Sequence, residues 1–281
     1  MLYTVKKNGF RLSASSLGAE LSSFYDCAGD YEYIWQKNEI WNGQSPLLFP
    51  VVGKVKNDCY RFGGKEYTMP KHGFARRAEF ALKEKTEDAL CFELRESPET
   101  LTQYPFHFSL QVRFTILEKG FEMRHTVENT GHEKMYFSLG AHPGFNCQMG
   151  DRIVMDEKET AHAHRLGQDA LRMPDVTPVF SDSREMEITP DIFEKDALIF
   201  SHLQSSGASL IRANGRNVHV DFGGAPALGL WAKPGAPYVC IEPWYGIDDT
   251  INATGELKEK EEILCLQPGE KFEFPVAVQV L

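Results

Sequence analysis

Residues 108–128 read FSLQVRFTILEKGFEMRHTVE and predict an antiparallel hairpin. On both arms apolar side chains alternate with polar ones, which is the period of a strand with one buried face. Lys119 and Gly120 stand between the arms and suit a tight two-residue turn. A second hairpin of the same kind is predicted at residues 60–67, where Gly63 and Gly64 separate two short strand-like runs.

Strand-like runs recur along the whole chain, whereas helix signals are few. Residues 97–101 and 189–193 each begin with a hydroxyl residue followed by proline, which predicts one helical turn. No linker, low-complexity tract or repeat divides the chain. We therefore expect one all-β domain over residues 1–281, a large antiparallel β-sandwich with few short helices. The further strand-like runs are 3–6, 9–14, 79–84, 89–95, 185–189, 197–201, 208–212, 217–222, 226–231, 238–242 and 271–280.

The composition of the chain argues against some classes of function. The 281 residues carry a net charge of −10, which disfavours binding to nucleic-acid phosphates. No run of about 18 apolar residues predicts a membrane span, and the N-terminal residues lack the apolar core of a signal peptide. We expect a cytoplasmic protein whose six cysteines are reduced and mostly buried.

Residues 137–146, FSLGAHPGFN, place His142 where a strand pattern stops. Proline and glycine follow directly and force the chain to turn. A side chain at such a junction between scaffold and loop is well placed for chemistry. Residues 70–76, PKHGFAR, hold His72 in a similar setting between Pro70 and Gly73.

Residues 238–246, YVCIEPWYG, predict a buried strand that delivers Glu242 and ends at Pro243. A buried glutamate is costly unless it is paired or used. Trp244 and Tyr245 offer flat apolar faces with polar edges, which suit a sugar ring. Residues 45–54, SPLLFPVVGK, end in Lys54 but lack the spacing of a phosphate-binding loop.

Other motifs give weaker evidence for a functional site. His162 and His164 lie on one side of a predicted strand, as in some metal sites, but no third ligand follows at a telling spacing. Asp248 and Asp249 are expected to form an exposed acidic turn. Neither a nucleophile elbow nor a dinucleotide-binding glycine motif is present.

The motifs PKHGFAR, SLGAHPGFN and IEPWYG, in this order, resemble the aldose 1-epimerase (galactose mutarotase-like) superfamily. The FPVVGK segment and residues 196–200 are similar to its LacX-like branch. This likeness extends from about residue 45 to about residue 250. It implies a galactose mutarotase-like supersandwich with a sugar site in a cleft on one face.

The resemblance also implies roles for individual residues. It makes His142 the general acid and Glu242 the general base of anomer exchange. No metal and no cofactor is implied. Around them we expect a set of substrate contacts: His72 near the sugar, Asp196 on its hydroxyls, Lys54 where relatives often have arginine, Arg76 four residues beyond His72, and Trp244.

The expected function is therefore an isomerase, an aldose 1-epimerase that acts on a small-molecule hexose, possibly phosphorylated, as a monomer or homodimer. Three alternatives stay open. One is a non-catalytic carbohydrate-binding or sugar-sensing protein on the same fold. Another is a hexose-6-phosphate 1-epimerase, which needs cations such as Lys54 and Arg76 at the cleft mouth. The third is a metal-dependent β-barrel enzyme that uses His162 and His164.

Overall fold

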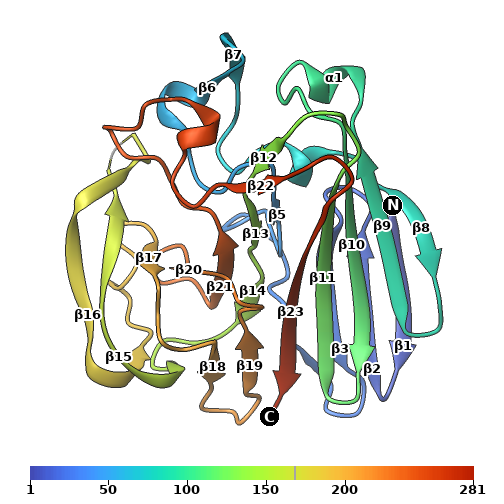
Figure 1. The fold of residues 1–281 in the computed structure, drawn as a ribbon. Helices are drawn as coiled ribbons and strands as arrows, with labels where there is room; N and C mark the ends of the chain where they lie inside the picture. The colour runs from blue at the N-terminus through green and yellow to red at the C-terminus, as the bar shows by residue number, and fades with distance from the viewer. Residues whose placement is uncertain (168) are drawn as a thin grey trace.

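The computed structural model of the protein describes residues 1–167 and 169–281, and in this part of the chain β-strands dominate (Figure 1). Among the described residues, none of the helices has the length and apolar character needed to span a bilayer. The strands are β1 Leu2–Lys7, β2 Phe10–Ser15, β3 Glu20–Asp26, β4 Tyr31–Glu32, β5 Leu47–Leu48, β6 Cys59–Phe62, β7 Lys65–Thr68, β8 Ala81–Lys85, β9 Ala89–Arg95, β10 Phe108–Leu117, β11 Gly120–Asn129, β12 Met135–Phe137, β13 Leu139–Ala141, β14 Gly144–Asn146, β15 Arg152–Leu166, β16 Arg172–Glu187, β17 Leu198–Ser201, β18 Gly207–Ile211, β19 Val218–Asp221, β20 Ala227–Trp231, β21 Tyr238–Tyr245, β22 Leu264–Leu266 and β23 Lys271–Val280. The helical segments are α1 Pro98–Leu101 and the 3₁₀ turns η1 Lys56–Asp58, η2 Ala75–Arg77 and η3 Leu257–Glu259.

Most of these strands join one antiparallel sheet of 15 strands. Thirteen of them follow the order β5-β13-β21-β20-β17-β15-β18-β19-β23-β11-β10-β9-β8, while β14 pairs with β21 and β16 pairs with β15. Both predicted hairpins are confirmed, but the turn of the first is Glu118–Lys119 and not Lys119–Gly120, because Gly120 already belongs to β11. Leu117 pairs with Gly120 across the β10–β11 turn, and Phe62 pairs with Lys65 across the β6–β7 turn. The capped helical turn at α1 is also confirmed, because the Ser97 hydroxyl accepts a hydrogen bond from the backbone N–H of Thr100.

A second sheet, β1-β2-β3-β4, packs on the part of the large sheet that contains β9–β11 (Figure 1). Aromatic rings join the two layers: the Phe24 ring lies 4.6 Å from that of Phe121, and the Tyr3 ring lies 5.7 Å from that of Phe92. Phe24, Phe92 and Phe121 are fully buried. The predicted all-β sandwich class is therefore confirmed, and its core lies between these aromatic faces.

Two expectations about local structure are wrong. Residues 190–195 form a turn and not a helix, and Asp196, two residues before β17, takes a left-handed backbone conformation (φ 65°). Of the strand expected at residues 185–189, residues 185–187 are strand, but they are the end of the much longer β16, which pairs with β15 through several register shifts. Those shifts break the simple alternation on which the strand prediction depended.

The expectation that Pro243 ends its strand is also wrong, since β21 continues to Tyr245. On one side β21 pairs with β14 and then with β13, and the chain between these two strands leaves the ladder at His142 and Pro143. The Ile241 N–H points to this side and donates to the Pro143 carbonyl at 3.3 Å. Alternate residues point the same way, so the Pro243 nitrogen faces the gap, where no N–H is needed.

Removal of one ring between the two layers tests this packing. We expect Phe121→Ala to lower the free energy of unfolding by about 3–5 kcal/mol, because the cavity lies in a dry interface. Urea unfolding measures the change, with Thr126→Ala on the half-buried outer face of β11 as the control. A loss for Phe121→Ala no larger than that for the control would contradict the two-layer core.

Candidate active site

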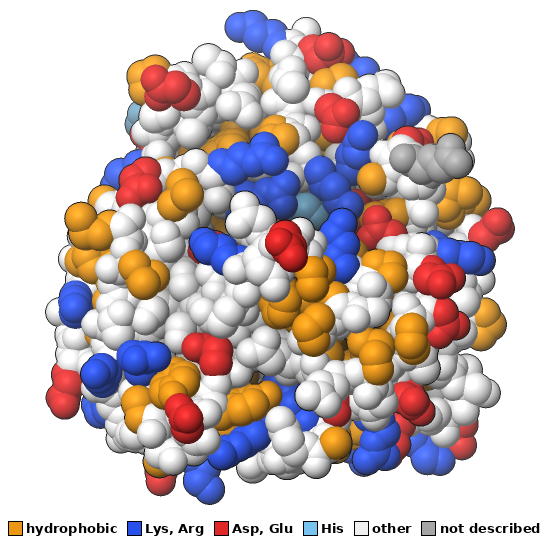
Figure 2. Space-filling view, turned by 180° about the vertical axis from the view of Figure 1, so that it is seen from behind, with side chains coloured by type: hydrophobic (Ala, Val, Ile, Leu, Met, Phe, Trp, Pro, Cys, Tyr) orange, Lys and Arg blue, Asp and Glu red, His pale blue; other side chains and the backbone are white. Residues whose placement is uncertain are grey.

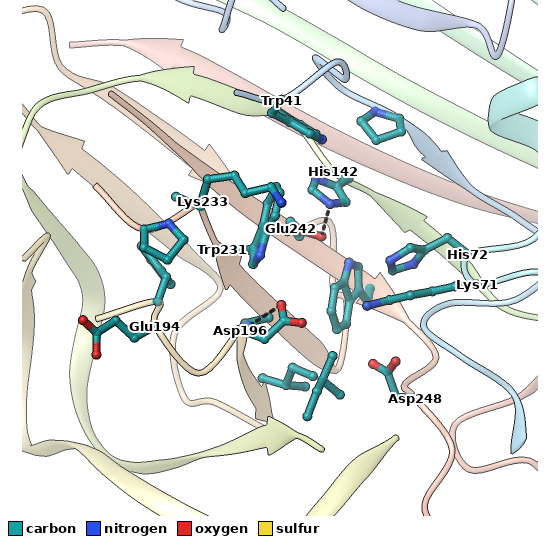
Figure 3. Close-up of a pocket in the computed structure, with 18 of the residues that line it drawn as sticks. Trp41, Lys71, His72, His142, Glu194, Asp196, Trp231, Lys233, Glu242 and Asp248 are labelled. Atoms are coloured by element: carbon teal, nitrogen blue, oxygen red, sulfur yellow. Dashed lines mark hydrogen bonds and ion pairs between the residues drawn. The ribbon is translucent and has the colours of Figure 1, made fainter. Parts of the chain in front are cut away.

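One cavity, about 440 Å³ in volume, opens over the middle of β21 and collects most of the side chains singled out in the sequence (Figure 3). Its volume is within the range of about 300–1,000 Å³ typical of small-molecule sites. Seven segments of the chain contribute to it. The lining comprises Trp41, Pro46, Lys71, His72, Arg76, His142, Leu166, Phe193, Glu194, Asp196, Ala197, Ile199, Trp231, Ala232, Lys233, Pro234, Glu242, Trp244 and Asp248.

His142 and Glu242 meet at this cavity. The interruption between β13 and β14 turns His142 out of the ladder, opposite the central part of β21 where Glu242 lies. The His142 Nε2 lies 3.2 Å from the Glu242 Oε2, and the His142 Nδ1 has no hydrogen-bond partner among the described residues (Figure 3). An imidazole and a carboxyl group thus lie side by side next to an open cavity.

Burial dominates the protonation of this pair. It lowers the pKa of His142 to about 3 and raises the pKa of Glu242 well above 4.5, so both neutral forms are favoured. The positive charge of Lys71 acts in the opposite direction on Glu242 and lowers its pKa. The pair therefore holds one proton over a wide pH range, either as carboxylic acid and imidazole or as carboxylate and imidazolium.

His72 is oriented by the backbone of Gly53. The Gly53 N–H donates to the His72 Nδ1 at 3.1 Å, and the His72 N–H donates to the Gly53 carbonyl at 2.7 Å. Burial lowers the pKa of His72 well below 6.5 and keeps the ring neutral. Since Nδ1 accepts, we infer that Nε2 carries the proton. The His72 and His142 rings lie 6.0 Å apart, with their planes at 79°.

Aromatic rings form much of the remaining wall. The Trp41 ring stacks on His142 at 5.4 Å, and Trp231 meets the same imidazole edge-on at 5.8 Å. Trp244 lies in a slot between neighbouring strands, where a Cβ on Gly140 would approach its ring to 2.8 Å and one on Gly229 to 2.5 Å. These glycines on β13 and β20 leave the space that the indole fills.

The sequence-predicted residues do not all reach the cavity. His142, Glu242, His72, Arg76, Asp196 and Trp244 do, but Lys54 turns away, and its Nζ lies 3.3 Å from the Asp58 carboxylate. Tyr245 lies on the opposite face of β21 from Trp244, where it packs on Phe272. An alternation count along β21 would have separated Tyr245 from Glu242 and Trp244.

Asp248 and Asp249 are buried and do not form the exposed turn that was expected. The Asp248 carboxylate accepts the Lys54 N–H at 2.8 Å, and the Asp249 carboxylate accepts the Lys56 N–H at 3.0 Å. Lys260 pairs with Asp249 at 2.9 Å. The two acids thus fix the loop that carries Gly53, and through Gly53 they support the orientation of His72.

Sequence reasoning passed over Lys71, Trp41, Trp231 and Lys233, all of which line the cavity. Lys71 directly precedes His72 and could have been found from that adjacency. Trp41 and Trp231 lie in segments whose sequences carry no local signal for a site, so only the fold brings them to His142.

Metal binding receives little support from these side chains. The ligand atoms of His142, Cys240 and Glu242 lie within 4.8 Å of one another. However, Cys240 is fully buried, and burial raises the pKa of its thiol well above 9, which disfavours the thiolate that a metal needs. Of the histidine pair on β15, His162 is exposed and His164 is half-buried.

Comparison with known proteins agrees with the fold. The aldose 1-epimerase family model matches residues 1–278. The LacX protein of Lactococcus lactis subsp. lactis is 30% identical over 286 residues, which covers 95% of each chain. A galactose mutarotase related enzyme from Lactobacillus acidophilus superposes with a TM-score of 0.94 at 33% identity, covering 100% of this chain and 97% of the other. A galactose mutarotase-like protein from Lactobacillus casei has the same TM-score at 26% identity, with both chains fully covered.

The antiparallel β-sandwich is thus the fold of galactose mutarotase-like proteins. The chain belongs to the aldose 1-epimerase family.

The buried carboxyl group leads to a stability prediction. The folded-state pKa of Glu242 is raised above its unfolded value, so the stability that it contributes is present below about pH 4.5 and decreases as the pH rises. Glutamine stays neutral at every pH. We therefore expect Glu242→Gln to have a higher Tm than the wild type at pH 7–8 and to lose this advantage below pH 4.5.

Differential scanning calorimetry across this pH range makes the comparison. Glu118→Gln, in the exposed β10–β11 turn, is the matched control and should follow the wild type at each pH. A Glu242→Gln Tm equal to or below that of the wild type at pH 8 would contradict the raised pKa.

Proposed function

We propose that the protein is an aldose 1-epimerase that interconverts the α and β anomers of a hexose by acid–base ring opening and closure. The observation that carries this proposal is the 3.2 Å approach of His142 to Glu242 beside a cavity walled by tryptophans. Family membership supports the reaction class.

Anomer exchange needs two proton transfers on one hemiacetal. A base removes the proton of the C1 hydroxyl while an acid protonates the ring oxygen. The C1–O5 bond then breaks to give the open-chain aldehyde. Rotation about C1–C2 presents the other face of the carbonyl, and the same two groups act in reverse as the ring closes. The net proton count of the site is unchanged, so the two groups need to hold one proton between them.

Glu242 and His142 meet this requirement. With Glu242 as carboxylate and His142 as imidazolium, Glu242 is the base and His142 the acid. Burial favours the neutral pair, and the positive charge of Lys71 favours the carboxylate. A bound sugar places hydroxyl groups against both side chains, and these stabilise the charged pair by hydrogen bonding.

The other cavity residues are assigned binding roles. The neutral His72 donates from Nε2 to a sugar oxygen and stabilises the open-chain carbonyl. One Asp196 oxygen accepts the Ala197 N–H at 2.8 Å, and the carboxylate is exposed at the cavity to receive sugar hydroxyls. Trp244 and its neighbouring tryptophans pack on the CH-rich face of the ring. The chemistry is complete with proton transfer alone, so no cofactor takes part.

A sugar-binding protein without activity would use the same cavity and the same tryptophans. The adjacent acid and base favour catalysis over this alternative, since binding alone does not need a proton-sharing pair in a dry setting.

Removal of either group tests the proposal. We expect Glu242→Gln and His142→Asn each to slow anomer exchange by about 10²–10⁴-fold, the usual contribution of a positioned acid or base. Polarimetry on freshly dissolved α-glucose and α-galactose follows the reaction. The exposed residues Glu118 and His132 supply matched controls, as Glu118→Gln and His132→Asn. Near-native rates in both site variants would end the assignment.

A further inference from the structure

We propose that Trp41 is a positioning residue of the proposed reaction, in which the face of its indole ring stabilises the positively charged form of His142. The inference rests on the proposed function and adds to the same site a residue that acts through the acid. Trp41 lies on the connection between β4 and β5 and reaches the cavity beside His142 (Figure 3). The role follows from how the two rings face each other and from the charges that surround them.

The two rings lie face to face. Their centroids are 5.4 Å apart and their planes are inclined by 27°, whereas Trp231 meets the same imidazole at 81°. The face of an indole carries partial negative charge, so it attracts a cation that lies within about 6 Å of the ring centroid. A neutral imidazole carries no net charge and gains far less. The contact with Trp41 therefore favours the imidazolium that the proposed mechanism needs as its acid.

Most of the other surroundings of His142 oppose a positive charge. Burial lowers its pKa to about 3, the backbone of the residue itself acts in the opposite direction, and the charges of Arg76 and Lys71 lower the pKa further. His72, whose ring lies 6.0 Å away, is kept neutral by burial. Figure 2 shows Lys and Arg side chains gathered around a hollow in which a histidine is visible, and the cations of the cavity lining are Lys71, Arg76 and Lys233. An imidazolium in this place needs a negative charge or a negative ring face beside it.

The acidic side chains do not meet this need by themselves. Those that line the cavity are Glu194, Asp196, Glu242 and Asp248. Burial raises the pKa of Glu242, and the charges of Asp196 and Asp248 raise it further, which keeps the shared proton on the carboxyl group. The Cys240 thiol lies within 4.8 Å of the pair but is uncharged, because burial raises its pKa well above 9. Apart from the hydroxyl groups of a bound sugar, the cavity then offers Lys71 to stabilise the carboxylate and the face of Trp41 to stabilise the imidazolium.

The fold fixes Trp41 in this place. Its carbonyl accepts the Trp35 indole N–H at 3.1 Å, and its ring stacks on Tyr238 at 5.0 Å with the planes inclined by 18°. A Cβ on Gly144 would come within 2.7 Å of the indole, so the ring lies directly against this backbone. Gly144 follows the interruption that presents His142, so the same feature of the sheet places both rings.

This role differs in its kinetic signature from stacking on a sugar. An aromatic surface that only holds the sugar binds the ground state and the transition state alike, so its loss raises KM. A face that stabilises the imidazolium moves the pair from its neutral form to the charged form that reacts. Loss of that face leaves fewer sites in the reactive form, so it lowers kcat and leaves KM little changed.

Fluorinated tryptophans at position 41 test the electrostatic contact with little change in shape. Fluorine withdraws electrons from the indole and weakens the negative charge of its face. We expect kcat for glucose and galactose at pH 7 to decrease with one, two and four fluorine atoms, by about fivefold to tenfold over the series, and KM to stay constant. The matched control is the same series at Trp35, which supports the same segment but does not line the cavity, and it should leave kcat unchanged.

Substitution gives a second measurement. Trp41→Phe keeps a weaker aromatic face and should lower kcat less than Trp41→Leu, which keeps an apolar side chain without such a face. A flat fluorine series, an equal fall in kcat in the Trp35 series, or a rise in KM alone in Trp41→Leu would overturn the proposal and leave the epimerase assignment intact. If the wild type exchanges no anomers, the epimerase assignment fails and this inference fails with it, so the two failures are distinguishable.

Discussion

The site depends on one interruption in the main sheet. β13 and β14 both pair with β21, and the chain between them leaves the ladder for His142 and Pro143. That gap directs an imidazole toward the carboxyl group of Glu242 and makes room for Pro243, which cannot donate to a ladder. A continuous strand in this place would send the His142 side chain to a regular face of the sheet and separate it from Glu242.

Burial then sets the chemistry of the pair. The same dry setting lowers the pKa of His142 and raises that of Glu242, so the two groups compete for one proton at a distance of 3.2 Å. Burial makes a charged pair expensive here, which is why the nearby cation Lys71 and the sugar hydroxyls matter. The tryptophans that pack on His142 are also surfaces expected to hold the sugar ring, so protonation and binding depend on the same wall.

Much of this could be predicted from sequence, and the limits have physical reasons. Alternation identified the hairpins and the all-β class because each strand has one buried face. Proline and glycine beside His142 and His72 marked the turns that present them. The tryptophans at 41 and 231 could not be found, because their place is decided by contacts between distant segments. Lys54 was wrongly expected to contact the substrate, because the local motif does not reveal that its ammonium group pairs with the Asp58 carboxylate. The end of β21 was predicted wrongly at Pro243, because the gap that accommodates this proline lies between β13 and β14 and leaves no local signal in β21.

In the proposed reaction, His142 and Glu242 act as one proton-sharing unit on a single anomeric centre. The most direct test of this shared role is magnetisation exchange between the α and β anomer signals, measured by NMR for the double variant His142→Asn/Glu242→Gln beside the two single variants. Groups that work as a unit are not additive, so the double variant should be no slower than the slower single variant. Losses that multiply in the double variant would show two independent groups and contradict a shared role in proton transfer.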